Sequence, residues 1–276
     1  MLAGRTILHR CWASSMIPAA ILATIEGADV SWHPSLLAGL QAVDRADPAY
    51  LSALVQEDYL PTRGRLLAAF AQPIDSVRYV LVGEGPYPRA DSATGVCFMD
   101  GAVDMLWSEK GLSKSVNRAT SLRNFMKMLL VADGTLTPGH TSGEAMVVAG
   151  AQALQPGSNH IKTLPQLQQN LSRQGFLLLN AALVFRSHVP PVRDARAWMP
   201  FLETIFAALV VRPVPPTLVL WGKIAAQIDG LPGMDRFPHL VAEHPYNLSF
   251  IDNGSMQKLF GPMQLLRCSA PNPANR

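Results

Sequence analysis

The chain has 276 residues, of which 49% are hydrophobic and 16% are charged. This length and composition suit one α/β domain with a sizeable core and exclude a disordered chain. The net charge of +3 excludes a protein that coats nucleic acid, although an enzyme that contacts a few phosphates needs no more if its charge is focused around the site.

The cysteine pattern limits the cofactors that we expect. Cys11, Cys97 and Cys268 are widely spaced and odd in number. They predict neither a disulfide framework nor a zinc site, and they cannot supply the four ligands of an iron–sulfur cluster. We therefore expect a reducing, intracellular compartment. No stretch approaches the roughly 18 apolar residues of a membrane span, so we expect no membrane partner.

The first 30 residues are read as an N-terminal extension, and residues 31–276 as the main domain. Arg5 and Arg10 precede a mildly apolar run, but Pro18 interrupts this run and no good small-residue cleavage site ends it. We expect an irregular extension or a short helix on the body of the domain.

Apolar residues at helical spacing predict three helices before the first buried strand, near Leu36–Val43, Pro48–Glu57 and Arg63–Ala71. The later elements alternate, with strands at Val77–Val82, Phe176–Asn180, Thr217–Trp221 and Leu240–Ala242, and helices at Leu122–Ala132, Leu164–Arg173, Trp198–Val211 and Ile224–Asp229. This alternation predicts a three-layer α/β/α fold around a four-stranded parallel sheet. Ser113–Asn117 is predicted as a polar loop, and the Gly-, Thr- and Ser-rich segment 133–158 as a small hairpin.

The first strand breaks at Gly83-Glu84-Gly85-Pro86, where two glycines and a proline predict a sharp turn. Such a turn exposes backbone N–H groups at the carboxyl edge of the sheet, where ligands bind in open α/β sheets. Taken alone, the turn fits any strand followed by a loop.

Five stretches in a fixed order resemble motifs of uracil-DNA glycosylases. They are GEGPYP with GVCF at 83–98 (GQDPYH…GLCF in the family), SLRN at 121–124 (SLKN), GFLLLN at 175–180 (GVLLLN), LWGK at 220–223 (LLWG) and HPYNLS at 244–249 (HPSPLS). The chain is identified on these motifs as a divergent relative of family 1 of this superfamily, over roughly Trp32 to Phe260.

The resemblance implies a pocket that receives a flipped uracil. Phe98 would stack on the base, the Asn180 amide would read its Watson–Crick edge, and Tyr87 beside Gly85 would exclude the methyl group of thymine. His244 would donate a hydrogen bond to uracil O2 as negative charge develops there.

The same resemblance implies a DNA-binding surface. Leu248 would enter the base stack as a wedge, and four residues would hold phosphates: Ser249, Ser121, Asn124 and Arg89. The family's activity needs no metal or cofactor. We expect a cytoplasmic monomer.

One departure concerns catalysis itself. Family 1 carries an aspartate that activates the attacking water, and Gly85 occupies that place here. Glu84 is our first candidate for the missing carboxylate, and Asp91, further along the same loop, is the second. The resemblance implies a monofunctional uracil-DNA glycosylase that acts on uracil-containing DNA. The alternatives are a non-catalytic binder of uracil or abasic DNA, a glycosylase for another deaminated base, and a small-molecule enzyme on the same sheet.

Overall fold

The computed structural model describes residues 17–268 and is built around a four-stranded parallel sheet with the order β4-β1-β5-β6. The strands are β1 (Tyr79–Gly83), β4 (Phe176–Asn180), β5 (Thr217–Trp221) and β6 (His239–Ala242). The predicted fold class is confirmed, and the limits of the second and third predicted strands agree with the structure at both ends. Near-continuous apolar strands are typical of a parallel sheet buried on both faces.

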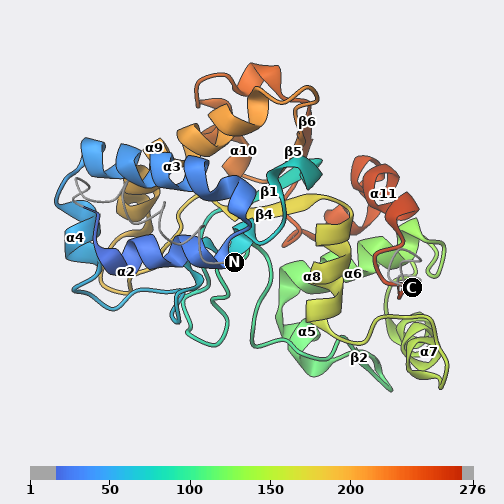
Figure 1. Cartoon of the computed structure of the whole chain (residues 1–276). Coiled ribbons are helices and arrows are strands. Elements are labelled where there is room, and N and C mark those ends of the chain that lie inside the picture. Colours follow the sequence, from blue (N-terminus) through green and yellow to red (C-terminus); the bar gives the residue numbers. More distant parts are fainter. Residues whose placement is uncertain (1–16, 269–276) are drawn as a thin grey trace, which may run out of the picture.

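The two faces of the sheet belong to two separate cores, because successive side chains of a strand point in opposite directions. In β1, Val80 and Val82 enter one core, whereas Leu81 enters the other. Figure 1 shows the first core's helices on one side of the sheet and those of the second core on the other.

The first core is covered by the α-helices α2 (Ala19–Leu22), α3 (His33–Ala46), α4 (Tyr50–Leu54), α9 (Pro191–Val210) and α10 (Ile224–Asp229). Short 3-10 helices join them at Ala23–Gly27, Val30–Trp32, Arg65–Phe70, Ile74–Ser76 and Met234–Arg236. Residues 17–28 belong to this core, through the buried side chains of Ile17, Ile21, Leu22 and Ile25. The domain boundary at residue 30 stays a prediction, and the part of the extension before residue 17 lies outside the described residues.

The second core is covered by α5 (Lys114–Arg118), α6 (Thr120–Ala132), α7 (Gly143–Leu154), α8 (Leu164–Arg173) and α11 (Gly254–Phe260). The 3-10 helices η6 (Leu248–Asp252) and η7 (Gly261–Met263) and a hairpin of β2 (Trp107–Ser108) and β3 (Gly111–Leu112) complete this side. Helix α8 begins as its sequence predicts, because Thr163 and Gln166 form a reciprocal capping box.

Three predicted elements are wrong. Segment 133–158 contains helix α7 in place of a hairpin, and the predicted loop Ser113–Asn117 is almost all helix α5, which Ser113 caps by accepting from Val116 N. Helix α9 begins at Pro191, before the predicted start at Trp198, and continues through Pro200. Both prolines suit a helix start, and the earlier one holds that position. In addition, the helix predicted at Arg63–Ala71 is a shorter 3-10 helix.

Candidate functional site

The carboxyl ends of the four strands bring the sequence-predicted residues to one edge of the sheet. Gly83 at the end of β1 lies in register with Asn180 at the end of β4. A Cβ atom on Gly83 would lie 2.7 Å from Cys97 Sγ and 3.1 Å from Asn180 Oδ1. Any residue larger than glycine at position 83 would therefore displace the Asn180 amide or Cys97. Asn180 is 4% exposed, and its side-chain amide has no hydrogen-bond partner within residues 17–268. Buried amides are normally paired, so this one is free to bind a ligand.

The aromatic ring of Phe98 is fixed by its neighbours. It packs edge-on against Phe125 and Trp221, with both pairs of ring centroids 5.3 Å apart. Its backbone φ of 68° lies in the left-handed region, which is rare for a bulky residue and common where a functional side chain must be presented. The ring itself is half-buried.

Tyr87 lies on the loop between β1 and Phe98 and is half-buried. Burial, followed by the nearby Cys97 and Asp100, raises the pKa of its hydroxyl, which therefore stays protonated. Burial also raises the pKa of the Cys97 thiol to about 12. Arg89, on the same loop, is largely exposed and reaches Asp100 Oδ2 at 3.4 Å.

His244 follows β6 and is held in one orientation. Gly222, after β5, has a φ of 70°, and a Cβ there would lie 2.9 Å from His244 Cβ. Tyr246 N donates to His244 Nδ1 at 3.1 Å, which leaves the proton of a neutral ring on Nε2. Burial of part of the ring lowers the pKa of His244, whereas the nearby Glu84 carboxylate acts in the opposite direction. His244 is therefore a neutral Nε2–H donor at pH 7.

A cavity of about 700 Å³ adjoins this edge and is lined by Glu84, Gly85 and Lys223, among others. A Cβ on Gly85 would make only ordinary contacts of 3.5 Å with Ala182, so a side chain fits at this position. Asp91 is exposed and does not line the cavity. His244 does not line this cavity, but the Glu84 carboxylate is near enough to act on the pKa of His244, whereas Asp91 is not among the groups that do so. The structure therefore favours Glu84 over Asp91.

The loop after His244 carries the predicted wedge. Leu248 is 68% exposed, as an apolar side chain that enters DNA must be. Asn124 is 1% exposed, and its Nδ2 donates to three carbonyls of this loop, those of Pro245 (2.8 Å), Tyr246 (3.3 Å) and Asn247 (3.3 Å). Asn124 therefore holds the loop. Ser249 is exposed, and Ser121 is half-buried in the first turn of α6.

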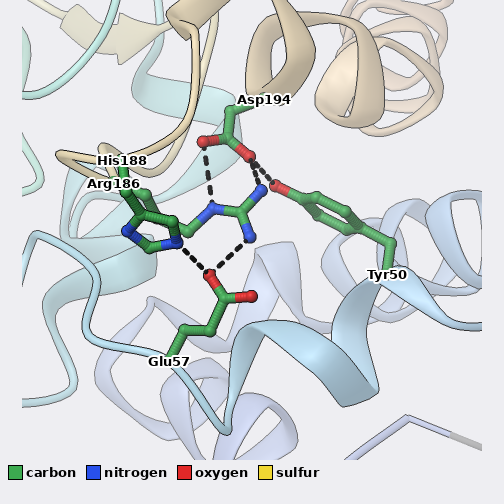
Figure 2. A network of polar contacts seen from close by, with 5 residues as sticks. All are labelled: Tyr50, Glu57, Arg186, His188 and Asp194. Atoms are coloured by element: carbon green, nitrogen blue, oxygen red, sulfur yellow. Dashed lines mark hydrogen bonds and ion pairs between the residues drawn. The ribbon is translucent and has the colours of Figure 1, made fainter.

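A polar network that sequence reasoning missed holds a second loop, residues 181–190, which follows β4. Figure 2 shows Arg186 between two carboxylates. Arg186 Nη2 and Nε donate to the two oxygens of Asp194 at 2.6 and 3.2 Å, and Nη1 donates to Glu57 at 2.9 Å. Tyr50 donates to Asp194 at 2.7 Å, and His188 donates to Glu57 at 2.8 Å. Only the proximity of Arg186 and Asp194 in sequence could have indicated part of this network.

Backbone hydrogen bonds connect the loop that this network holds to the candidate site. The loop that contains Arg186 begins with Ala181 N and Ala182 N, which donate to the carbonyls of Gly83 and Glu84 at 2.7 and 3.0 Å. Arg186 and Asp194 also line the large cavity together with Glu84. The network therefore fixes one wall of the space next to the candidate carboxylate.

Within residues 17–268, no three His, Cys, Asp or Glu side chains are grouped so that they could hold a metal ion. No helix in that range is long and apolar enough to cross a membrane.

Comparisons with known proteins agree with this geometry. The family model described as "Uracil DNA glycosylase superfamily" matches residues 71–264. The chain is 29% identical to uracil-DNA glycosylase 1 of Streptomyces coelicolor over 192 residues, covering 69% of this chain and 68% of that protein. It is 26% identical to uracil-DNA glycosylase of Tropheryma whipplei over 249 residues, covering 90% and 84%.

A solved structure gives a fuller match. The UNG crystal structure from Nitratifractor salsuginis is 41% identical, with a TM-score of 0.81, and the match covers 90% of this chain and 96% of that one. The family match extends over most of the described chain and includes every strand of the sheet whose edge forms the site. The chain therefore belongs to the uracil DNA glycosylase superfamily.

Proposed function

We propose that this protein is a monofunctional uracil-DNA glycosylase. It hydrolyses the N-glycosidic bond of deoxyuridine in DNA, releases uracil and leaves an abasic site for base excision repair. The observation that carries this proposal is the buried, unpaired amide of Asn180 at the sheet edge of a chain of this superfamily. An amide presents both a donor and an acceptor, which is what the Watson–Crick edge of uracil requires.

The pocket recognises uracil by shape and by hydrogen bonds once the nucleotide is flipped out of the duplex. Asn180 pairs with O4 and N3–H, and Phe98 stacks on the ring. Tyr87 occupies the space that the methyl group of thymine would need. The fixed ring of Phe98 and the glycine at position 83 support this assignment, because both set the pocket geometry before the base enters.

Bond cleavage leaves negative charge on the base and positive charge on the sugar. His244 Nε2–H donates to O2 and stabilises the leaving base, as a preorganised neutral donor can. Glu84 stabilises the sugar cation or activates the attacking water. It thereby takes the role of the family aspartate, whose place is occupied by Gly85 here. Its electrostatic contact with His244 supports Glu84 over Asp91, which lies away from the cavity.

The DNA is held around this pocket. Leu248 fills the gap left by the flipped nucleotide, and Ser249, Ser121 and Arg89 contact phosphates. Asn124 acts by positioning the wedge loop. We further propose that the enzyme is a monomer that needs no metal or cofactor. It acts in the cytoplasm, where its DNA substrate lies.

The test is single-turnover release of uracil from a labelled oligonucleotide, with thymine and hypoxanthine substrates alongside. We expect release from uracil only. E84Q should slow release by about 10²–10⁴-fold, the usual contribution of general-base catalysis, whereas D91N should leave it unchanged. The double variant E84Q/G85D should regain activity, since the Gly85 position has room for a carboxylate. Tight binding without release by the wild type would instead identify a non-catalytic binder.

Two glycines of the same turn provide a matched test of the Asn180 amide. G83A places a methyl group against Cys97 Sγ and Asn180 Oδ1, whereas G85A adds the same methyl group in ordinary contact with Ala182. G83A should therefore abolish measurable uracil release, and G85A should retain it. Equal activity of the two variants would contradict the role of Asn180.

A further inference from the structure

A basic stretch of the chain lies outside the pocket and has no role so far. From Lys110 to Ala132 the sequence contains five cations and no carboxylate, and the nearest acids are Glu109 and Asp133. The five cations are Lys110, Lys114, Arg118, Arg123 and Lys127. They make up a large share of the 23 lysines and arginines of a chain whose net charge is only +3.

The fold gathers these cations into one stripe that runs from the turn between β2 and β3 over α5 to α6. Lys110 and Lys127 line the same hollow of about 340 Å³, together with Asn117. Arg123 Nη1 donates to Asn117 O at 3.2 Å, next to Arg118. Burial first and then the charge of Arg123 lower the pKa of Lys127, so these two cations are close.

Several positions of the stripe are unfavourable for the fold itself. Lys114 and Arg118 are four residues apart on α5, and Arg123 and Lys127 are four residues apart on α6, so each helix carries a like-charge pair that destabilises it. Lys114 and Arg123 also lie in the first turns of their helices, where the helix dipole disfavours cations. None of the five forms an ion pair with any residue between 17 and 268. Their charge is therefore available to a polyanion.

The stripe begins beside the wedge loop. Asn124, which follows Arg123, binds the carbonyls of Pro245 to Asn247, and this loop leads directly to Leu248. Helix α5 occupies the place before the SLRN segment, so the stripe extends away from the loop over α5 and the β2–β3 hairpin. The stripe and the proposed wedge loop therefore meet at the Arg123–Asn124 end of the stripe.

We propose that Lys110, Lys114, Arg118, Arg123 and Lys127 form a phosphate-binding stripe that holds the duplex beside the flipped nucleotide, independently of its sequence. This inference rests on the proposed function. Lysine and arginine contacts of this kind release counterions and make DNA affinity depend on salt, whereas they carry no base specificity.

The test compares two triple variants with the same change of net charge. K110Q/K114Q/R118Q removes stripe cations and spares Arg123, which hydrogen-bonds within the fold. R45Q/R173Q/R236Q removes three exposed cations from other elements. The dissociation constant of an undamaged labelled duplex is measured between about 50 and 200 mM salt. Thermal unfolding of both variants serves as the folding control.

The stripe variant should reduce the slope of log K against log salt by about 3, close to one unit for each lost phosphate contact. The control variant should change the slope by less than about 1. Equal slopes for the two variants would overturn the stripe. Because the duplex carries no uracil, this readout is separate from uracil release: a wild type that binds duplex but releases no uracil contradicts the proposed function alone.

Discussion

The loop after β4 and the loop after β6 both border the candidate pocket, but different interactions hold them. Residues 181–190 are held by an ionic network around Arg186, with Asp194 and Glu57 as its carboxylates. The loop after His244 is held by one neutral amide, that of Asn124, which donates to three carbonyls. Leaving a buried charge unpaired costs more free energy than leaving a buried neutral amide unpaired. We therefore expect the first loop to control stability and the second to control activity.

R186M should have the largest effect on stability. It leaves the Asp194 carboxylate, 1% exposed, without its cation, and breaking a buried ion pair in this way costs about 3–5 kcal/mol of the free energy of unfolding. Urea unfolding measures the loss. R193M, which changes an exposed arginine nearby, is the control and should lose less than about 0.5 kcal/mol. A loss below about 1 kcal/mol for R186M would mean that the network is dispensable.

Y50F should have the next largest effect. Burial and the Asp194 carboxylate raise the pKa of Tyr50, so its hydroxyl is a proton donor at all ordinary pH values. Removing a hydrogen bond to a charged group costs about 1.5–3 kcal/mol. The expected result is a loss in that range in the same urea experiment, with uracil release per folded molecule close to that of the wild type.

N124L should destabilise the protein less than R186M but affect catalysis more than Y50F. Three carbonyls lose their shared donor, which costs about 1–3 kcal/mol. The loop that carries His244 and Leu248 then loses its fixed position, and uracil release should fall about 10–100-fold, since small misplacements of catalytic groups have effects of this size. Y50F is the stability-matched control. Equal rates of uracil release by N124L and Y50F would contradict the expectation that the loop after His244 controls activity and the loop after β4 controls stability.

The two loops should also respond to different pH ranges. His244 has a lowered pKa in the folded state, so the unfolded state binds its proton first, and stability falls as the pH drops below 6.5. Hydrogen bonds from Arg186 and His188 lower the pKa of Glu57, so its contribution is present above 4.5 and is lost at lower pH. H244N should flatten the first part of a stability–pH curve, and E57Q the second. His160, whose pKa burial also lowers, adds to the first range.

Short-range patterns predicted most of the fold. Strand β4 and helix α8 were predicted with the limits that the structure has, because continuous apolar runs and a Thr–Gln capping box act locally. Helix α7 was missed because its alanines, glycines and valines make a weakly amphipathic helix between Gly- and Ser-rich segments. It packs against the β2–β3 hairpin, where Gly150 meets Gly111 at close range, and no local pattern contains that contact.

The candidate site was predictable only where a motif carries it. The motifs single out Asn180, Phe98 and His244, each at or just after a strand or turn that the resemblance identifies, and their roles stay predictions. It placed Asn124 among the phosphate contacts, whereas the structure buries its amide under the wedge loop. The Arg186 network joins Tyr50 and Glu57 to residues far along the chain, and such long-range pairing leaves no periodic signal.

The strand order has a consequence for how the protein folds. Gly83 and Asn180 are neighbours in the sheet although most of the middle of the chain separates them, and His244 arrives only with the last strand. Contacts of this kind form slowly, because distant segments must meet before either is stabilised. A nascent chain that ends before β6 carries the ring and the amide that we propose for base stacking and base reading, but not the proposed donor for the leaving base. Uracil release is thus a direct readout of completed folding, and its recovery during refolding would time the docking of the final strand.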